Sequence, residues 1–159
     1  MDIEADIREL PAKTLLGRKI EMSVAANQTT LLWQGFMPRR DEIPSAVSKN
    51  LWAVQVYPSH YFEQFDPTTK FLKWAAVEVD EVTTIPEGME LLKVPAGLYA
   101  VFLYKGHSGN PEIFHYIYGE WLPASGYLLD NRPHFELLGE KFKLNDPLSE
   151  EEIWIPVRK

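Results

Sequence analysis

The chain has 159 residues, an apolar fraction of 45% and a formal net charge of −7. This length suits one domain or two small fused halves, and the apolar content supports a packed core, which excludes a disordered chain. The acidic balance disfavours a nucleic-acid backbone as the partner, because that partner requires clustered lysine and arginine. The lack of cysteine excludes disulfides, thiolate chemistry and cysteine-ligated zinc.

The acidic N-terminus has no apolar run and is not typical of a signal peptide, and nowhere do about 18 apolar residues follow one another. We therefore expect a cytoplasmic protein without a membrane segment. The four histidines show no metal-ligand spacing, and no nucleotide-binding or serine-hydrolase motif occurs, so we expect neither a metal nor a cofactor. Five Trp, seven Tyr and eight Phe provide rings that fill a core or line a pocket for a flat apolar ligand.

The first half of the chain predicts strands around a single helix. Asn27 or Thr29 is placed to cap the helix, apolar residues follow at helical spacing, and Pro38 is expected to end it. Alternating or continuous apolar runs predict the strands. The expected elements are a strand over 7–23, a helix over 27–37, and strands over 51–57 and 71–82, with a loop over 61–70.

The second half repeats this order. Asn110 and Pro111 are the expected start of a helix, as N-cap and first helical residue. The expected elements are a strand over 89–105 with a Pro-Ala-Gly break, a helix over 112–122, and strands over 135–144 and 152–157. We therefore predict one α+β domain of two repeats, about 1–82 and 83–159, with pseudo-two-fold symmetry, an antiparallel sheet, helices on one face and a central ligand cleft.

Glu136 is the main candidate for a functional charge. Alternation places it on the opposite face of its strand from Phe135 and Leu137. A carboxylate among aromatic residues can pair with a cationic ligand, or can have a raised pKa and transfer protons; the alternative is a solvent-facing position. Glu78 shares a face with Trp74 and is a second carboxylate near aromatic residues, with a solvated edge position as its alternative.

Several segments together resemble the GyrI-like family, also called the AraC-type effector-binding domain. They are V-E-V (77–79), I-P-E-G (85–88), V-P-A-G-L-Y-A-V-F (94–102), E-W-L-P-A-S-G-Y (120–127), P-H-F-E (133–136) and E-I-W-I-P-V (152–157). The resemblance implies a duplicated fold with a central aromatic pocket, in which an acidic residue neutralises lipophilic cations. The P-H-F-E segment assigns that role to Glu136, and Trp154 matches an aromatic residue of the last strand. Family members often carry tyrosine two residues after this glutamate, where this chain has Leu138.

Three functions follow as hypotheses. The first is binding of a small amphipathic or cationic ligand, for effector sensing or sequestration, with Glu136 as the countercharge. Its candidate lining residues are Trp33, Trp74, Glu78, Tyr99, Trp121 and Trp154. For each of these aromatic residues the alternative is plain core, for Trp121 above all.

The second hypothesis is a hydrolase of strained electrophiles, which some stand-alone relatives of the family resemble. Glu136 would act as general base or acid, assisted by Glu78 or Tyr99. The third is a protein-interaction role such as gyrase inhibition, by analogy with the family's namesake. Because the domain fills the chain, we expect no direct DNA binding; a protein partner or a homodimer is left open.

Overall fold

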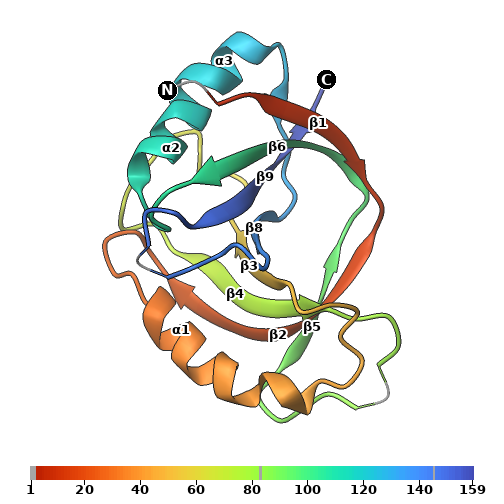
Figure 1. The fold of residues 1–159 in the computed structure, drawn as a ribbon. Coiled ribbons are helices and arrows are strands. Elements are labelled where there is room, and N and C mark those ends of the chain that lie inside the picture. The colour runs from red at the N-terminus through yellow and green to blue at the C-terminus, as the bar shows by residue number, and fades with distance from the viewer. Residues whose placement is uncertain (1–2, 83, 145) are drawn as a thin grey trace.

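The computed structural model describes residues 3–82, 84–144 and 146–159. Its strands pair in antiparallel fashion and its helices lie outside the sheet (Figure 1). The elements are β1 (Ala5–Leu10), β2 (Lys13–Met22), α1 (Thr29–Phe36), the 3₁₀ helix η1 (Met37–Glu42), β3 (Leu51–Val56), β4 (Phe71–Glu78), β5 (Glu90–Val94), β6 (Gly97–Lys105), α2 (Pro111–Tyr116), the π-helical turn η2 (Ile117–Trp121), α3 (Leu122–Ser125), β7 (Leu128–Leu129), β8 (His134–Leu138) and β9 (Glu150–Arg158).

The strand order of the sheet shows the duplication directly. The order is β1-β6-β9-β8-β3-β4-β2-β5, and the short β7 pairs with β9. By position in their repeats, β1 corresponds to β5, β2 to β6, β3 to β8, and β4 to β9. Exchanging each strand for its counterpart reverses the order and leaves it otherwise unchanged, so the pseudo-two-fold axis passes between β3 and β8. The predicted α+β class and duplicated topology are confirmed.

Two prolines divide the first long strand of each repeat, so the single strand predicted over 7–23 is in fact two strands. Pro11 separates β1 from β2, and Pro95 separates β5 from β6, because proline has no N–H to donate to a strand ladder. The two halves nevertheless pair in one register, with Leu10 opposite Gly97 and Lys13 opposite Val94. The sheet therefore curves back on itself and has a concave and a convex face (Figure 1).

The helices cover two separate parts of the convex face. Leu32 and Phe36 of α1 are buried with residues of β2 and β4, whereas Ile113 and Ile117 of the second helical segment are buried with residues of β6 and β9. The predicted placement of helices on one face is confirmed. The middle of that face, over β3 and β8, lies between the two helical clusters, and the candidate site is found there.

The ends of the helices follow local chemistry. Asn110 Oδ1 accepts a hydrogen bond from the Glu112 N–H at 3.1 Å, so α2 begins with the predicted N-cap. The N-cap of α1 is Gln28, which makes no side-chain cap hydrogen bond, so neither Asn27 nor Thr29 is the cap as predicted; Asn27 Oδ1 instead accepts from the N–H of Thr29, the first helical residue, at 2.9 Å. Pro38 does not end the helical backbone as predicted; the chain continues as η1, because proline is tolerated in a first turn.

The strand β8 is shorter than the predicted strand over 135–144. It ends at Leu138, and the next residue, Gly139, opens a turn in which the Phe142 N–H donates to the Gly139 carbonyl at 3.1 Å. The alternating sequence after Gly139 therefore forms a turn rather than a continuation of the ladder.

Candidate functional site

Glu136 lies on the convex face, in the middle of the sheet. It is directly opposite Ala53 of β3 and Ile153 of β9, and Ala53 is in turn opposite Ala75 of β4. Phe135 is buried on the concave face, as alternation predicted. Because the two alanine side chains are small, they leave space above the sheet on the β3 side of the Glu136 carboxylate. The two helical clusters lie on either side of this space.

Four polar side chains share the convex face with Glu136. Gln55 of β3 is directly opposite both Lys73 of β4 and His134 of β8, and Glu151 lies two residues before Ile153 on β9. Lys73 and Glu151 are buried, with exposed fractions of 9% and 8%. Charged residues are seldom buried to this extent in a core that serves stability alone.

Burial and mutual repulsion disturb the ionisation of the two carboxyl groups. Burial raises the pKa of Glu136, and the Lys73 charge and the Gln55 amide offset part of this rise. Burial, assisted by the charge of Glu136, raises the pKa of Glu151 to about 7, and Lys73 again acts in the opposite direction. The three charged residues therefore interact as one group.

An aromatic cluster lies beside Glu136, close enough for its charge to act on Tyr57 and Tyr118. We define it as Tyr57, Tyr61, Phe62, Tyr118 and His134. Phe62 stacks on His134 with ring centres 5.4 Å apart and an interplanar angle of 14°, and it contacts Tyr118 at 4.9 Å. Tyr57 meets His134 at 4.9 Å and Tyr61 at 4.4 Å. The cluster thus joins the β3–β4 loop (residues 57–70), β8 and the second helical segment.

The π-helical turn η2 positions Tyr118 in this cluster. Its hydroxyl group forms a hydrogen bond of 2.9 Å with His134 Nδ1. Turns of this type are rare and occur often at functional sites, because they change the direction of side chains along a helix. Here the turn lies between α2 and α3, and its Tyr118 contacts Phe62 of the β3–β4 loop.

The aromatic cluster is uncharged at neutral pH. Burial, with a smaller contribution from Arg132, lowers the pKa of His134 to about 3. Burial raises the pKa of Tyr57 and of Tyr118 well above the usual value, and the nearby Glu136 charge contributes to both shifts. The cluster therefore provides ring faces and hydroxyl groups beside Glu136 but no cation to neutralise it.

Three of the predicted aromatic residues lie on the concave face, away from Glu136. Trp74, Tyr99 and Trp154 belong to the buried concave core together with Phe135. Trp154 Nε1 donates to Glu152 Oε1 at 3.0 Å. The Tyr99 hydroxyl group donates to the carbonyl oxygen of Pro133 at 2.7 Å, so this residue anchors the start of β8. The sheet itself separates these rings from the carboxylate.

The other predicted residues lie apart from this group as well. Trp33 packs edge-on against Phe36 in the α1 cluster, with ring centres 5.9 Å apart. Trp121 packs edge-on against Phe102 at 5.1 Å in the second helical cluster. Glu78 pairs with Lys13, with 3.2 Å between Oε2 and Nζ. The structure therefore brings Glu136 alone, of the seven predicted residues, to the centre of the convex face.

Some members of the observed group had a signal in the sequence that was missed. Alternation in 51–57 and 71–78 places Gln55, Tyr57 and Lys73 on the same face as Ala53 and Ala75, so a polar residue on a buried face was visible in both strands. Tyr118 and Phe62 had no such signal, because their positions depend on a π-helical turn and on the course of a loop.

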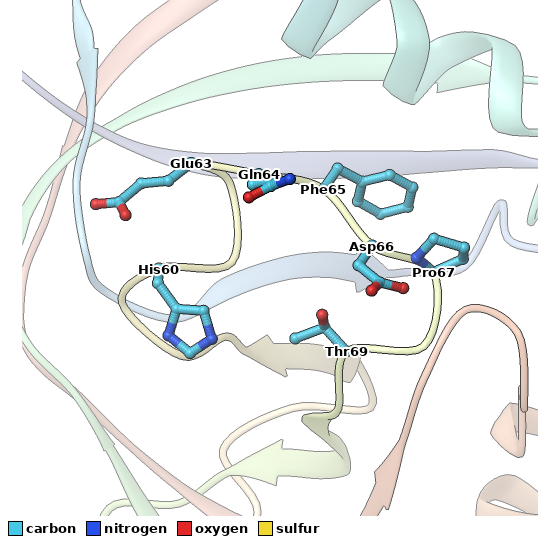
Figure 2. Close-up of a pocket in the computed structure, with 7 residues that line it drawn as sticks. All are labelled: His60, Glu63, Gln64, Phe65, Asp66, Pro67 and Thr69. Atoms are coloured by element: carbon cyan, nitrogen blue, oxygen red, sulfur yellow. The ribbon is translucent and has the colours of Figure 1, made fainter.

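A surface hollow of about 460 Å³ lies at the β3–β4 loop (Figure 2). Its lining residues are His60, Glu63, Gln64, Phe65, Asp66, Pro67 and Thr69. The hollow contains neither Glu136 nor a member of the aromatic cluster. Over residues 3–82, 84–144 and 146–159, no group of three histidine or acidic residues could hold a metal ion. No helix in these ranges is long and apolar enough to cross a membrane.

The duplicated, curved antiparallel sheet with helices on its convex face is the architecture of small-molecule effector-binding domains. Residues 6–157 match the family described as Cass2, an integron-associated effector binding protein. The chain belongs to this family, and the resemblance to effector-binding domains predicted from the sequence is confirmed.

Individual proteins show the same relationship. The transcriptional regulator BrlR of Pseudomonas aeruginosa is 32% identical over 162 residues, covering 98% of this chain and 56% of the regulator, so the chain spans little more than half of that relative. SAV2435, in a structure bound to tetraphenylphosphonium, has a TM-score of 0.68 at 18% identity, covering 98% of this chain and 94% of that one. The integron cassette protein VCH_CASS2 of Vibrio cholerae has a TM-score of 0.63 at 18% identity, covering 99% of this chain and all (100%) of that one. The last two similarities show the fold.

Proposed function

We propose that this chain binds a small lipophilic cation on the convex face of the sheet, for effector sensing or sequestration. Glu136 is the countercharge and the aromatic cluster forms the apolar wall. The observation that carries the proposal is a half-buried carboxylate in the centre of a sheet, beside uncharged tyrosine rings and with a pKa raised by burial. A buried charge without a close partner is costly, and a bound cation relieves that cost.

The rings of the cluster suit the same ligand. The faces of Tyr57, Phe62 and Tyr118 attract cations, and this attraction increases when water is excluded. Phe62 is the exposed member, with 37% of its surface accessible, so it is the residue that a ligand displaces from the stack on His134. The relative SAV2435, with the same fold, is bound to the lipophilic cation tetraphenylphosphonium, which supports this class of ligand.

The test compares two ions of the same shape and opposite charge. Tetraphenylphosphonium and tetraphenylborate are titrated into the wild type, Glu136→Gln and the control Glu140→Gln, with tryptophan fluorescence and calorimetry as readouts. Glu140 is exposed, so both variants lose one carboxylate but only one loses it at the site. We expect the wild type and Glu140→Gln to bind the cation, and Glu136→Gln to bind it about thirtyfold more weakly, since losing one partner of a buried ion pair costs about 2 kcal/mol or more.

Two results contradict the proposal. One is equal affinity for the cation in all three proteins, and the other is preference of the wild type for tetraphenylborate. Mass spectrometry of a strained electrophile after incubation distinguishes binding from turnover, because a hydrolase would return a changed molecule, whereas tetraphenylphosphonium has no bond that such a hydrolase opens.

A further inference from the structure

Lys73 is an unusual residue in this sheet. It lies on the buried convex face of β4, between Phe71 and Ala75, and is 9% exposed. Lys13 and Lys19, in contrast, each lie 3.2 Å from a carboxylate oxygen, of Glu78 and Glu90 respectively. In the part of the chain that the structure describes, no carboxylate oxygen lies within 4.0 Å of Lys73 Nζ.

The lysine faces two carboxylates rather than one. Gln55 of β3 lies between Lys73 of β4 and the strand β8, which carries Glu136. Glu151 lies on the next strand, β9. The charge of Lys73 acts on both Glu136 and Glu151, and these two carboxylates repel each other. The other side chains of the site are uncharged at neutral pH. With both carboxylates ionised, the buried group therefore holds one net negative charge.

From this arrangement we propose that Lys73 and Glu151 adjust the charge around Glu136 so that the site selects monovalent cations over divalent ones. The inference rests on the function proposed above. A bound monocation leaves the buried group neutral, whereas a dication leaves a buried positive charge and a neutral ligand leaves a negative one. Either residual charge is unfavourable in a water-poor environment. Lys73 is thus a specificity-determining residue that acts by its charge.

A double-mutant cycle tests the charge count. Lys73→Met makes the group one unit more negative, Glu151→Gln makes it neutral, and the double variant returns it to the wild-type value. The probes are tetraphenylphosphonium as the monocation and benzyl viologen as an aromatic dication, titrated at about pH 8.5, where Glu151 with its pKa of about 7 is ionised. Lys73→Arg keeps the charge, and Lys143→Met removes a positive charge at an exposed position.

We expect Lys73→Met to raise the affinity ratio of dication to monocation by about tenfold or more. Glu151→Gln is expected to weaken tetraphenylphosphonium binding by about tenfold although Glu136 is intact. The double variant, Lys73→Arg and Lys143→Met are expected to keep the wild-type ratio. If Lys73→Met does not fold, comparing Glu151→Gln with the double variant still tests the count, because the double variant leaves no extra unpaired charge.

Failure of this inference differs from failure of the proposed function. If Glu136→Gln abolishes tetraphenylphosphonium binding while Lys73→Met and Glu151→Gln keep the wild-type affinities for both probes, charge selection by Lys73 is refuted and the proposed function stands. If the wild type binds neither cation, both are refuted. If the double variant fails to restore the affinity that Glu151→Gln loses, charge counting is refuted as the reason for that loss.

Discussion

His134 makes the stability of this protein sensitive to acid. Its imidazole is buried against Phe62 and Tyr57. Burial and, to a smaller extent, the positive charge of Arg132 disfavour its protonation and lower its pKa from 6.5 to about 3. In the unfolded chain the same group titrates near its usual value. Between these two pKa values the unfolded chain binds one more proton, so stability is complete above about pH 6.5 and falls as the pH falls toward 3.

The magnitude follows from proton linkage. Between about pH 7.5 and about pH 5, this single group lowers the free energy of unfolding by about 2 kcal/mol. The value depends mainly on the pKa in the unfolded chain, because at pH 5 the folded imidazole, with a pKa of about 3, is still neutral. Glu136 and Glu151, with raised pKa values, act with the opposite sign, so the effect of His134 must be isolated by difference.

The assay is urea unfolding of the wild type and His134→Gln at several pH values. The glutamine side chain does not titrate, and its amide can still form a hydrogen bond with Tyr118. We expect the wild type to lose about 2 kcal/mol relative to the variant between about pH 7.5 and about pH 5, with most of the change below 6.5. A stability difference that stays constant over this range would refute a neutral, buried imidazole at this position.

Three further predictions concern packing and hydrogen bonding, each measured by chemical denaturation at neutral pH. Gly17→Ala is expected to lower the free energy of unfolding by about 3 kcal/mol, because a Cβ at this position would lie 2.0 Å from the Ala75 carbonyl oxygen. The control Gly119→Ala is expected to be neutral or stabilising, because a Cβ there would meet nothing within 4 Å. Tyr118→Phe is expected to cost about 1–3 kcal/mol by leaving His134 Nδ1 without its partner; an unchanged midpoint would argue against the hydrogen bond. Asn110→Ala is expected to cost about 1 kcal/mol, and a loss below a few tenths would show that its cap does not hold α2.

Most boundaries of the strands and helices were predictable, because proline and helix-capping residues act on the backbone at their own positions. The Pro-Ala-Gly break interrupts a long strand where the structure does, and Asn110 with Pro111 starts α2 at the expected position, whereas the interruption at Pro11 was not predicted. The errors were also local. Gly139 allows a turn that alternation could not distinguish from a strand, and Pro38 was expected to end a helical stretch that continues in a tighter form.

The site was less predictable, because it depends on which side chains face the same side of the sheet. Glu136 was assigned from its segment, and its face followed from alternation with Phe135. Three of the rings expected beside it, Trp74, Tyr99 and Trp154, are on the other face, because these residues alternate with the convex residues of their own strands. Tyr118 and Phe62 come from a π-helical turn and a loop, whose geometry has no periodic pattern to read.

The passage of the pseudo-two-fold axis between β3 and β8 has a consequence for how binding can evolve. In a symmetric pair of separate half-sized chains, every substitution near the axis would occur twice, so a central acid would always face its own copy. In a fused chain the two sides of the axis change independently. Here Ala53 from one repeat faces Glu136 from the other. Fusion thus permits the two central strands to differ, and a carboxylate can lie at the pseudo-two-fold axis without a second copy of itself directly opposite.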